Sequence, residues 1–147
     1  MKILLATDGS FYSRKMLKNF AGRTLASNTK IKIIAAFEGA SYMMNIGPTG
    51  PINEYYNTSN NYSLKLAENA IKIAGAALRK KHPSLSITSA VVEGPPKLVI
   101  LEEAEKFGAD LIVVGSHGYG FVERFLLGSV SQAVAVHAKC SVEIVRN

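Results

Sequence analysis

The chain has 147 residues, a typical length for one domain with its own core, and we expect a single domain over residues 1–147. Its 17 Lys and Arg residues outnumber its 11 Asp and Glu residues, but they are scattered without interleaved aromatic residues, so nucleic acid is not an expected partner. No run approaches the roughly 18 apolar residues that cross a bilayer, and the single cysteine, Cys140, excludes an internal disulfide, so we expect a soluble cytoplasmic protein.

The first part of the chain contains two strand patterns separated by a helix pattern. Residues 2–7 form a nearly continuous apolar run, which is typical of a strand covered on both faces of a parallel sheet. Turn residues follow, and Ser10 is the predicted N-cap of a helix over residues 11–27, in which apolar residues recur at helical spacing. A second apolar run predicts a strand over residues 31–37.

Residues 38–62 break this regularity. They contain four tyrosines, two adjacent methionines and several Gly, Pro and Asn residues, without helical or strand periodicity. A loop of this length is uncommon inside a compact domain and often serves as a lid or a binding segment. Although the aromatic side chains could cover a ligand or a partner, we favour a mobile surface excursion whose aromatic residues pack locally.

The rest of the chain alternates helix and strand patterns. The predicted helices cover residues 63–81, 97–107 and 129–138, and the predicted strands cover residues 85–92, 110–114 and 141–146. The strand over 85–92 begins with apolar and small polar residues in alternation, so we place it half exposed near an edge of the sheet. In the last helix, His137 shares the apolar face and is expected to pack. Five strands alternating with four helices predict an α/β fold with a parallel sheet and right-handed crossovers.

The fourth predicted strand leads into a glycine-rich stretch that is a candidate anion site. Gly115, Gly118 and Gly120 follow the strand, and Gly128 and Ser129 open the last helix. Backbone N–H groups can approach a ligand closely at glycine, and a helix N-terminus offers unpaired N–H donors. Glycines also occur simply because turns require them, and the spacing alone leaves this alternative open.

Asp8, at the end of the first strand, is expected to lie near this stretch. Open parallel sheets bind ligands beyond the carboxyl ends of their strands, and a central first strand would place Asp8 in one crevice with Gly115. A carboxylate there can accept hydrogen bonds from ribose hydroxyls, while the glycine loop and the helix start donate to phosphates. Taken alone, Asp8 fits a turn residue better. Its pairing with the glycine loop favours the ligand role.

The common nucleotide-binding loops are absent. The phosphate loop G-x-x-x-x-G-K-[ST] needs a Gly-Lys-Ser/Thr sequence, which does not occur in the chain. Gly118 and Gly120 begin a G-x-G-x-x-G pattern, but its last position is Glu123. The spacing present instead is G-x2-G-x9-G-[ST], formed by Gly115, Gly118, Gly128 and Ser129.

This spacing resembles that of the nucleotide-binding members of the universal stress protein family. The opening K-I-L-L-A-T-D-G-S, the stretch A-D-L-I-V-V-G-S-H-G and the closing part from L-L-G-S to E-I-V-R also look like the family, so only about residues 38–62 fall outside the resemblance. It implies a Rossmann-like open sheet of five parallel strands in the order 3-2-1-4-5, with helices on both faces. It also implies ATP as the ligand, often with Mg²⁺ or Mn²⁺ on the phosphates.

The resemblance assigns a role to each candidate site residue. Asp8 would meet the ribose, and Ala36, at the end of the second strand, would present its backbone to the adenine. Ser129 would hold the phosphates through its hydroxyl and the others mainly through N–H groups; the phosphate-binding residues would be Gly115, Gly118, Gly128, Ser129 and Val130. No residue is assigned as catalytic or as a metal ligand.

Homodimers are also common in the family, through antiparallel pairing of the last strands. Here that pairing would use Val142 to Val145 and would close an exposed sheet edge. Glu143 lies in this segment, where a two-fold axis could bring it near its own mate at a cost in stability. Either Arg146 offsets that charge or Glu143 faces water.

Three functions remain open. The first is an ATP-binding regulatory or stress-response module that changes conformation or partners with its nucleotide. The second is a slow ATPase or phosphotransferase, for which His117 and Arg124 are the loop residues to nominate. The third is a partner-binding dimer that has lost its nucleotide, but its usual sign, a broken glycine motif, is missing here. We favour the first.

Overall fold

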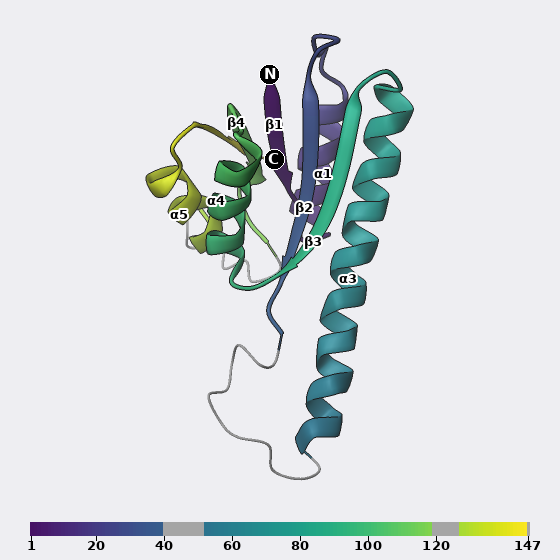
Figure 1. Ribbon diagram of the computed structural model, residues 1–147, viewed down its shortest axis with the longest axis vertical. Coiled ribbons are helices and arrows are strands. Elements are labelled where there is room, and N and C mark those ends of the chain that lie inside the picture. Colours follow the sequence, from purple (N-terminus) through teal and green to yellow (C-terminus); the bar gives the residue numbers. More distant parts are fainter. Residues whose placement is uncertain (40–51, 119–126, 147) are drawn as a thin grey trace.

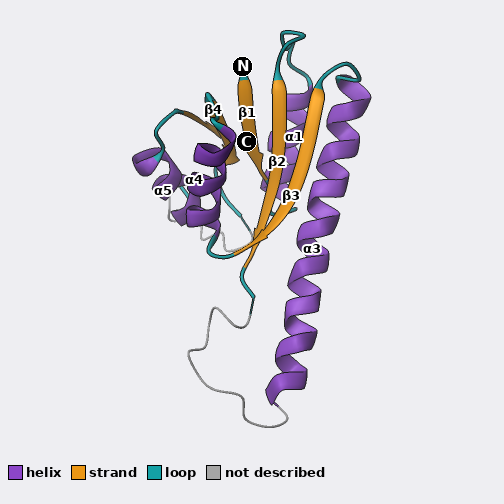
Figure 2. Cartoon of the chain, viewed as in Figure 1, coloured by secondary structure: helices purple, strands orange, loops and turns teal. Residues whose placement is uncertain are grey.

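Five parallel strands form one sheet in the order β3-β2-β1-β4-β5, which confirms the expected fold (Figures 1 and 2). The computed structural model describes residues 1–39, 52–118 and 127–146. The strands are β1 (Lys2–Ala6), β2 (Lys30–Phe37), β3 (Ser86–Glu93), β4 (Leu111–Gly115) and β5 (Ser141–Val145). The helices are α1 (Phe11–Ala21), α3 (Ile52–Lys81), α4 (Pro96–Phe107) and α5 (Ser129–His137).

Helices cover both faces of the sheet (Figure 1). On one face, Ile3 and Leu5 of β1 belong to a core cluster with Phe20 of α1 and Leu78 of α3. On the other face, Leu4 belongs to a cluster that α4 and α5 complete. Successive strand side chains point to opposite faces, so a central strand covered on both sides needs an unbroken apolar run. This requirement explains the sequence of β1, whose three central side chains are fully buried.

The helix α1 begins where its cap predicts and ends earlier than expected. Oγ of Ser10 accepts a hydrogen bond from the N–H of Ser13 at 3.2 Å, as an N-cap does. The prediction that the helix continues to residue 27 is wrong, because it ends at Ala21. The N–H of Gly22 there donates to carbonyls of the preceding turn, which tightens the helix end. Leu25 lies after the end of α1 but still packs against the core. Its apolar side chain therefore reflects burial and did not indicate a longer helix.

The helix α3 corrects the interpretation of residues 38–62 as a loop. It begins at Ile52, so the part of that segment from residue 52 onward is helical, while residues 40–51 lie outside the described residues. Figure 1 shows that the start of α3 extends past the carboxyl ends of the strands. A helix segment beyond the sheet has no core to face, so no apolar periodicity is required of it. Tyr62, just before the periodic part, is accordingly 66% exposed.

The exposure of two further elements was also predicted from sequence. The strand β3 lies at one edge of the sheet, and Ser86, Thr88 and Ser89 are exposed, which confirms the prediction of a half-exposed edge strand. The prediction that His137 packs against the core is wrong, because its side chain is exposed at the end of α5. Of the helices in the described ranges, none is long and apolar enough to cross a membrane.

An ion pair joins the opposite edge strand, β5, to the segment after α1. Nη1 of Arg23 donates to Oε2 of Glu143 at 2.6 Å, and Nη2 donates to Oε1. The hydrogen bonds from Arg23 hold the pKa of Glu143 below its usual range. Glu143 therefore has a partner that the sequence did not suggest, since the alternatives considered for it were Arg146 and water.

Candidate functional site

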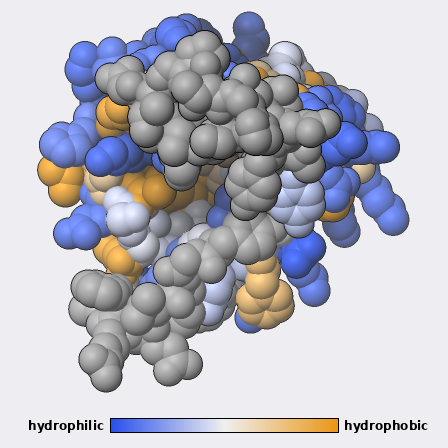
Figure 3. Space-filling view, turned by 90° about the horizontal axis from the view of Figure 1, so that it is seen from below, coloured by the Kyte–Doolittle hydropathy of each residue, from blue (hydrophilic) through white to orange (hydrophobic). Residues whose placement is uncertain are grey.

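A cavity of about 520 Å³ opens at the end of the sheet where the strands terminate. It lies among the ends of β1, β2 and β4 and the first turns of α4 and α5. Figure 3 views this end of the molecule and shows hydrophobic side chains in the hollow. All seven residues predicted to contact a ligand line the cavity: Asp8, Ala36, Gly115, Gly118, Gly128, Ser129 and Val130.

The carboxylate of Asp8 is held in one orientation at the end of β1. Its Oδ1 accepts a hydrogen bond from the N–H of Ser10 at 2.9 Å and another from Oγ of Ser13. Its Oδ2 lies next to Gly118. No group in the described part of the chain donates a hydrogen bond to Oδ2. The carboxylate therefore keeps one oxygen with which to bind a ligand.

Close packing, and not a turn conformation, explains two of the motif glycines. A Cβ atom at position 118 would lie 2.6 Å from Oδ2 of Asp8, a distance at which one of the two groups must move. An added Cβ at Gly128 would lie 3.2 Å from the carbonyl oxygen of Ser116, whereas at Gly115 its contacts would be ordinary. None of these three glycines has a positive φ angle. This argues against the alternative that they serve only to turn the chain.

The first turn of α5 forms one side of the cavity. Gly128 is its N-cap and has no side chain to satisfy the first N–H groups of the helix, which lack intrahelical partners. Oγ of Ser131 contacts the carbonyl oxygens of Gly115 and Ser116 at 2.9 and 3.1 Å and so ties the helix to the loop after β4. Unpaired backbone donors at the positive end of a helix suit an anionic ligand.

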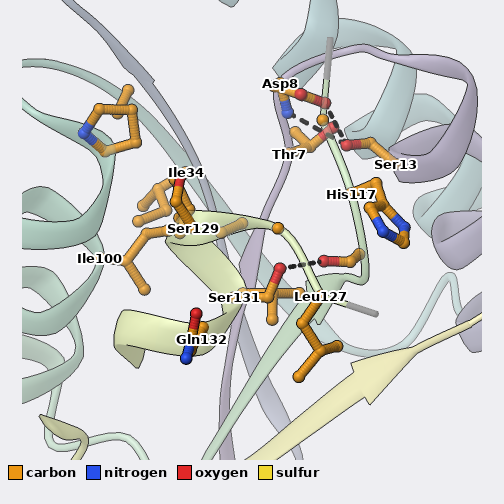
Figure 4. A pocket seen from close by; sticks show the side chains of 18 residues that line it. Thr7, Asp8, Ser13, Ile34, Ile100, His117, Leu127, Ser129, Ser131 and Gln132 are labelled. Atoms are coloured by element: carbon orange, nitrogen blue, oxygen red, sulfur yellow. Dashed lines mark hydrogen bonds between the residues drawn. The ribbon is translucent and has the colours of Figure 1, made fainter. Parts of the chain in front are cut away.

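Another side of the cavity is apolar. Its side chains come from β2, β4 and α4: Ile34, Ala36, Pro96, Ile100 and Val114. Figure 4 shows Ile34 and Ile100 on one side of the cavity and Asp8 and Ser13 on the other. An apolar wall facing a few fixed polar groups is the usual construction of a small-molecule site. The cavity therefore suits a ligand with an apolar part, a hydrogen-bond donor for Asp8 and an anionic part.

His117 lines the same cavity in the loop after β4. Its Nδ1 lies 3.0 Å from Oγ of Ser116, and its ring centroid lies 5.4 Å from that of Tyr12. The imidazole is therefore placed beside the site by neighbours on both the loop and α1. Arg124, the other loop residue nominated from sequence, lies outside the described residues.

Residues 1–146 match the model of the universal stress protein family. This chain belongs to the universal stress protein family. Universal stress protein MJ0531 from Methanocaldococcus jannaschii is 31% identical to it over 151 residues, which cover 99% of this chain and 81% of the relative.

Solved structures carry the same fold. The structure of hypothetical protein MJ0577 superposes with a TM-score of 0.84 at 25% identity, covering 99% of this chain and 95% of the other. A universal stress protein solved in complex with cAMP superposes with a TM-score of 0.66 at 26% identity, covering 99% of this chain and 96% of the other. The fold of this universal stress protein is thus shared with a protein that holds an adenine nucleotide.

Sequence reasoning missed several residues that build the cavity in this universal stress protein. Ser13 and Ser131 lie inside helices, and only their burial, to 4% and 3% exposure, marks them as more than surface residues. Pro96 and Ile100 enter the cavity from α4. The Pro-rich turn after β3 was the signal that could have placed α4 at the cavity. That turn follows the carboxyl end of a strand, and parallel strands all end at the same side of a sheet.

Proposed function

We propose that this universal stress protein binds ATP in the cavity and acts as a nucleotide-dependent regulatory or stress-response module. One observation carries the proposal: Oδ2 of Asp8, to which no group in the described part of the chain donates, lines one cavity with the apolar wall and the first turn of α5. Ribose hydroxyls need an acceptor, adenine needs an apolar surface and phosphates need N–H donors. The cAMP complex of a structure 26% identical to this chain supports an adenine nucleotide as the ligand class.

Each part of the nucleotide has its residues in this proposal. Oδ2 of Asp8 accepts from the ribose, and the backbone of Ala36 meets the polar edge of the adenine, whose faces contact the apolar wall. N–H groups of the loop and of the first turn of α5 hold the phosphates, together with the hydroxyl of Ser129; the backbone donors are those of Gly115, Gly118 and Val130. Gly128 was also expected to donate, but its N–H is already bonded to the carbonyl oxygen of Ser116 at 2.8 Å, so Gly128 lines the phosphate side without a free N–H.

A divalent ion such as Mg²⁺ or Mn²⁺ would accompany the phosphates in this proposal. Within the described ranges, no three His, Cys, Asp or Glu side chains come together as a metal site. Hard divalent cations commonly bind phosphate oxygens and water and need few protein ligands. The ion would therefore neutralise the phosphates and contribute little to holding the protein together.

Pairing of β5 with a second copy of the chain is the form of homodimer that we propose. β5 is the terminal strand of the sheet, so one of its edges has no strand beside it in the described part of the chain. Arg23 neutralises Glu143, which removes much of the like-charge cost that the sequence raised against antiparallel pairing of Val142 to Val145. Sedimentation equilibrium tests this: a monomer at every concentration contradicts the dimer and leaves ATP binding unaffected.

Slow ATP hydrolysis is a second candidate activity, favoured by the position of His117 beside the cavity. A single-turnover assay with the wild-type protein and with His117→Ala distinguishes the two functions. Hydrolysis by the wild-type protein that disappears in the variant would favour an enzymatic function over the regulatory one. A rate that is slow and equal in both proteins supports a binding module.

The direct test of ATP binding needs no assumption about the signal that the protein serves. Purified protein is denatured and the released small molecules are identified by mass spectrometry, and stripped protein is titrated with ATP by calorimetry. We expect ATP in the released fraction and saturable binding in the titration. No released nucleotide together with no binding heat would contradict the proposal.

A further inference from the structure

We propose that Ser13 is a positioning residue for nucleotide binding, because its hydroxyl fixes the Asp8 carboxylate so that Oδ2 is presented to the ribose. This inference rests on the proposed function. Ser13 lies in the first turn of α1, outside the glycine motif, and is 4% exposed. It lines the same cavity as Asp8 (Figure 4).

The direction of the hydrogen bond between these two side chains follows from their chemistry. An ionised carboxylate only accepts hydrogen bonds, so the single hydroxyl proton of Ser13 is donated to Oδ1 of Asp8. Oδ1 also accepts the N–H of Ser10 at 2.9 Å. With two donors, this oxygen is largely satisfied, and Oδ2 is left for another partner.

The hydroxyl of Ser13 is itself held by its neighbours. Its oxygen lies 3.3 Å from the N–H nitrogen of Asp8 and 3.3 Å from Oγ of Ser10, both of which can donate to it. Oγ of Ser10 in turn accepts the N–H of Ser13 at 3.2 Å. Oγ of Ser10 could also accept the proton of Ser13, but the charged carboxylate of Asp8 is the stronger acceptor, so the proton is directed at Asp8.

Fixing the carboxylate has a consequence for affinity. Rotation about the terminal bond of an aspartate side chain is soft, and its preferences are broad. Without the Ser13 hydroxyl, only the N–H of Ser10 would hold the carboxylate, which would rotate more freely. Ordering it on ligand binding would then cost free energy. With Ser13, the ribose meets an acceptor that is already oriented.

A purely structural role for Ser13 predicts a different result. If the Ser13 hydroxyl only supports the turn before α1, its loss should loosen that turn. Binding of every nucleotide should then weaken to the same extent. The cap of α1 itself would remain, because Oγ of Ser10 accepts the backbone N–H of Ser13. A positioning role acts only on the interaction with the ribose hydroxyls. The two roles differ in whether the effect depends on those hydroxyls.

The experiment measures the ratio of dissociation constants for 2′,3′-dideoxy-ATP and ATP by calorimetry. In the wild-type protein, ATP binds more tightly because only ATP carries the hydroxyls that Asp8 accepts. We expect Ser13→Ala to lower this ratio by about threefold to tenfold, the equivalent of roughly one neutral hydrogen bond. Ser13→Thr, which retains the hydroxyl, should restore most of the ratio.

Ser131→Ala is the matched control, since Ser131 is equally buried and lines the same cavity but bonds the phosphate-side loop. It should weaken both nucleotides alike and leave the ratio unchanged. If Ser13→Thr does not fold, as judged by its Tm, a double variant takes its place. Asp8→Ala is combined with Ser13→Ala, and the ratio should equal that of Asp8→Ala alone. A wild-type ratio that persists in Ser13→Ala overturns this inference alone, whereas absence of ATP binding to the wild-type protein overturns the proposed function with it.

Discussion

Gly118 and Asp8 come into contact because position 118 has no side chain: a Cβ atom there would lie 2.6 Å from Oδ2 of Asp8. The two residues belong to loops at the ends of β1 and β4, which are neighbours in the sheet. The absence of a side chain at position 118 therefore leaves room for the carboxylate that we propose contacts the ribose.

Gly118→Val should weaken ATP binding by at least about tenfold, or about 1.4 kcal/mol. Its side chain would push Asp8 out of its orientation and occupy space beside the cavity. Calorimetric titration measures the change. Gly22→Val is the control, because Gly22 is exposed, has a φ of −79° and lies after α1 away from the cavity. Equal affinities of the two variants would remove Gly118 from the site.

Asp8→Ala should weaken ATP binding by about 1.5–3 kcal/mol, the range for hydrogen bonds to a charged group. Because the lost interaction is with the ribose, the same substitution should hardly change binding of 2′,3′-dideoxy-ATP. Asp110→Ala serves as the control, since Asp110 pairs with the backbone N–H of Lys2 at the amino end of β1. A loss of equal size for both nucleotides would show that Asp8 supports the loop and does not contact the ribose.

Glu143→Gln should lower the free energy of unfolding by about 0.5–1 kcal/mol at neutral pH. The effect is small because the side chains of Arg23 and Glu143 are about a third exposed, at 35% and 31%. Urea denaturation measures it. Glu105→Gln is the control, because the pair of Glu105 with Lys139 is more exposed and should contribute nothing measurable. If the two variants lose the same stability, β5 is not held by Arg23.

Glu103→Gln should cost more, about 1.5–3 kcal/mol, because Glu103 is 8% exposed and accepts from Lys32 at 2.7 Å. The hydrogen bond from Lys32, followed by that from Lys106, holds the pKa of Glu103 below its usual range. A carboxyl with a lower pKa in the folded state stabilises the protein above its unfolded pKa and loses that contribution as the pH falls.

The difference in stability between the wild-type protein and Glu103→Gln should therefore be full at pH 7 and shrink once the pH falls below about 4.3, the ordinary Glu value. Urea denaturation at a series of pH values measures this difference. Glu102→Gln, at an exposed position of the same helix, should show no such dependence. A difference that grows toward acid pH would contradict the assigned direction of the pKa.

The sequence by itself determined those features that depend on neighbours along the chain. The sequence shows the apolar run of β1 and the cap at Ser10, which the backbone geometry of these elements demands. It also shows Gly108, which ends α4 with a φ of 64°, a conformation that favours glycine. The gathering of Asp8 and Gly115 at one cavity was also predictable, because parallel strands place their carboxyl ends at the same side of a sheet.

Only the tertiary structure decided which distant groups meet. Arg23 and Glu143 are 120 positions apart and meet because the core cluster joins Phe20 of α1 to Val145 of β5. The burial of Ser13 and the end of α1 at Ala21 likewise depend on what lies against them. Periodicity along a helix or strand shows which side faces a core, but the partner on that side is set by the packing of elements, which no local pattern contains.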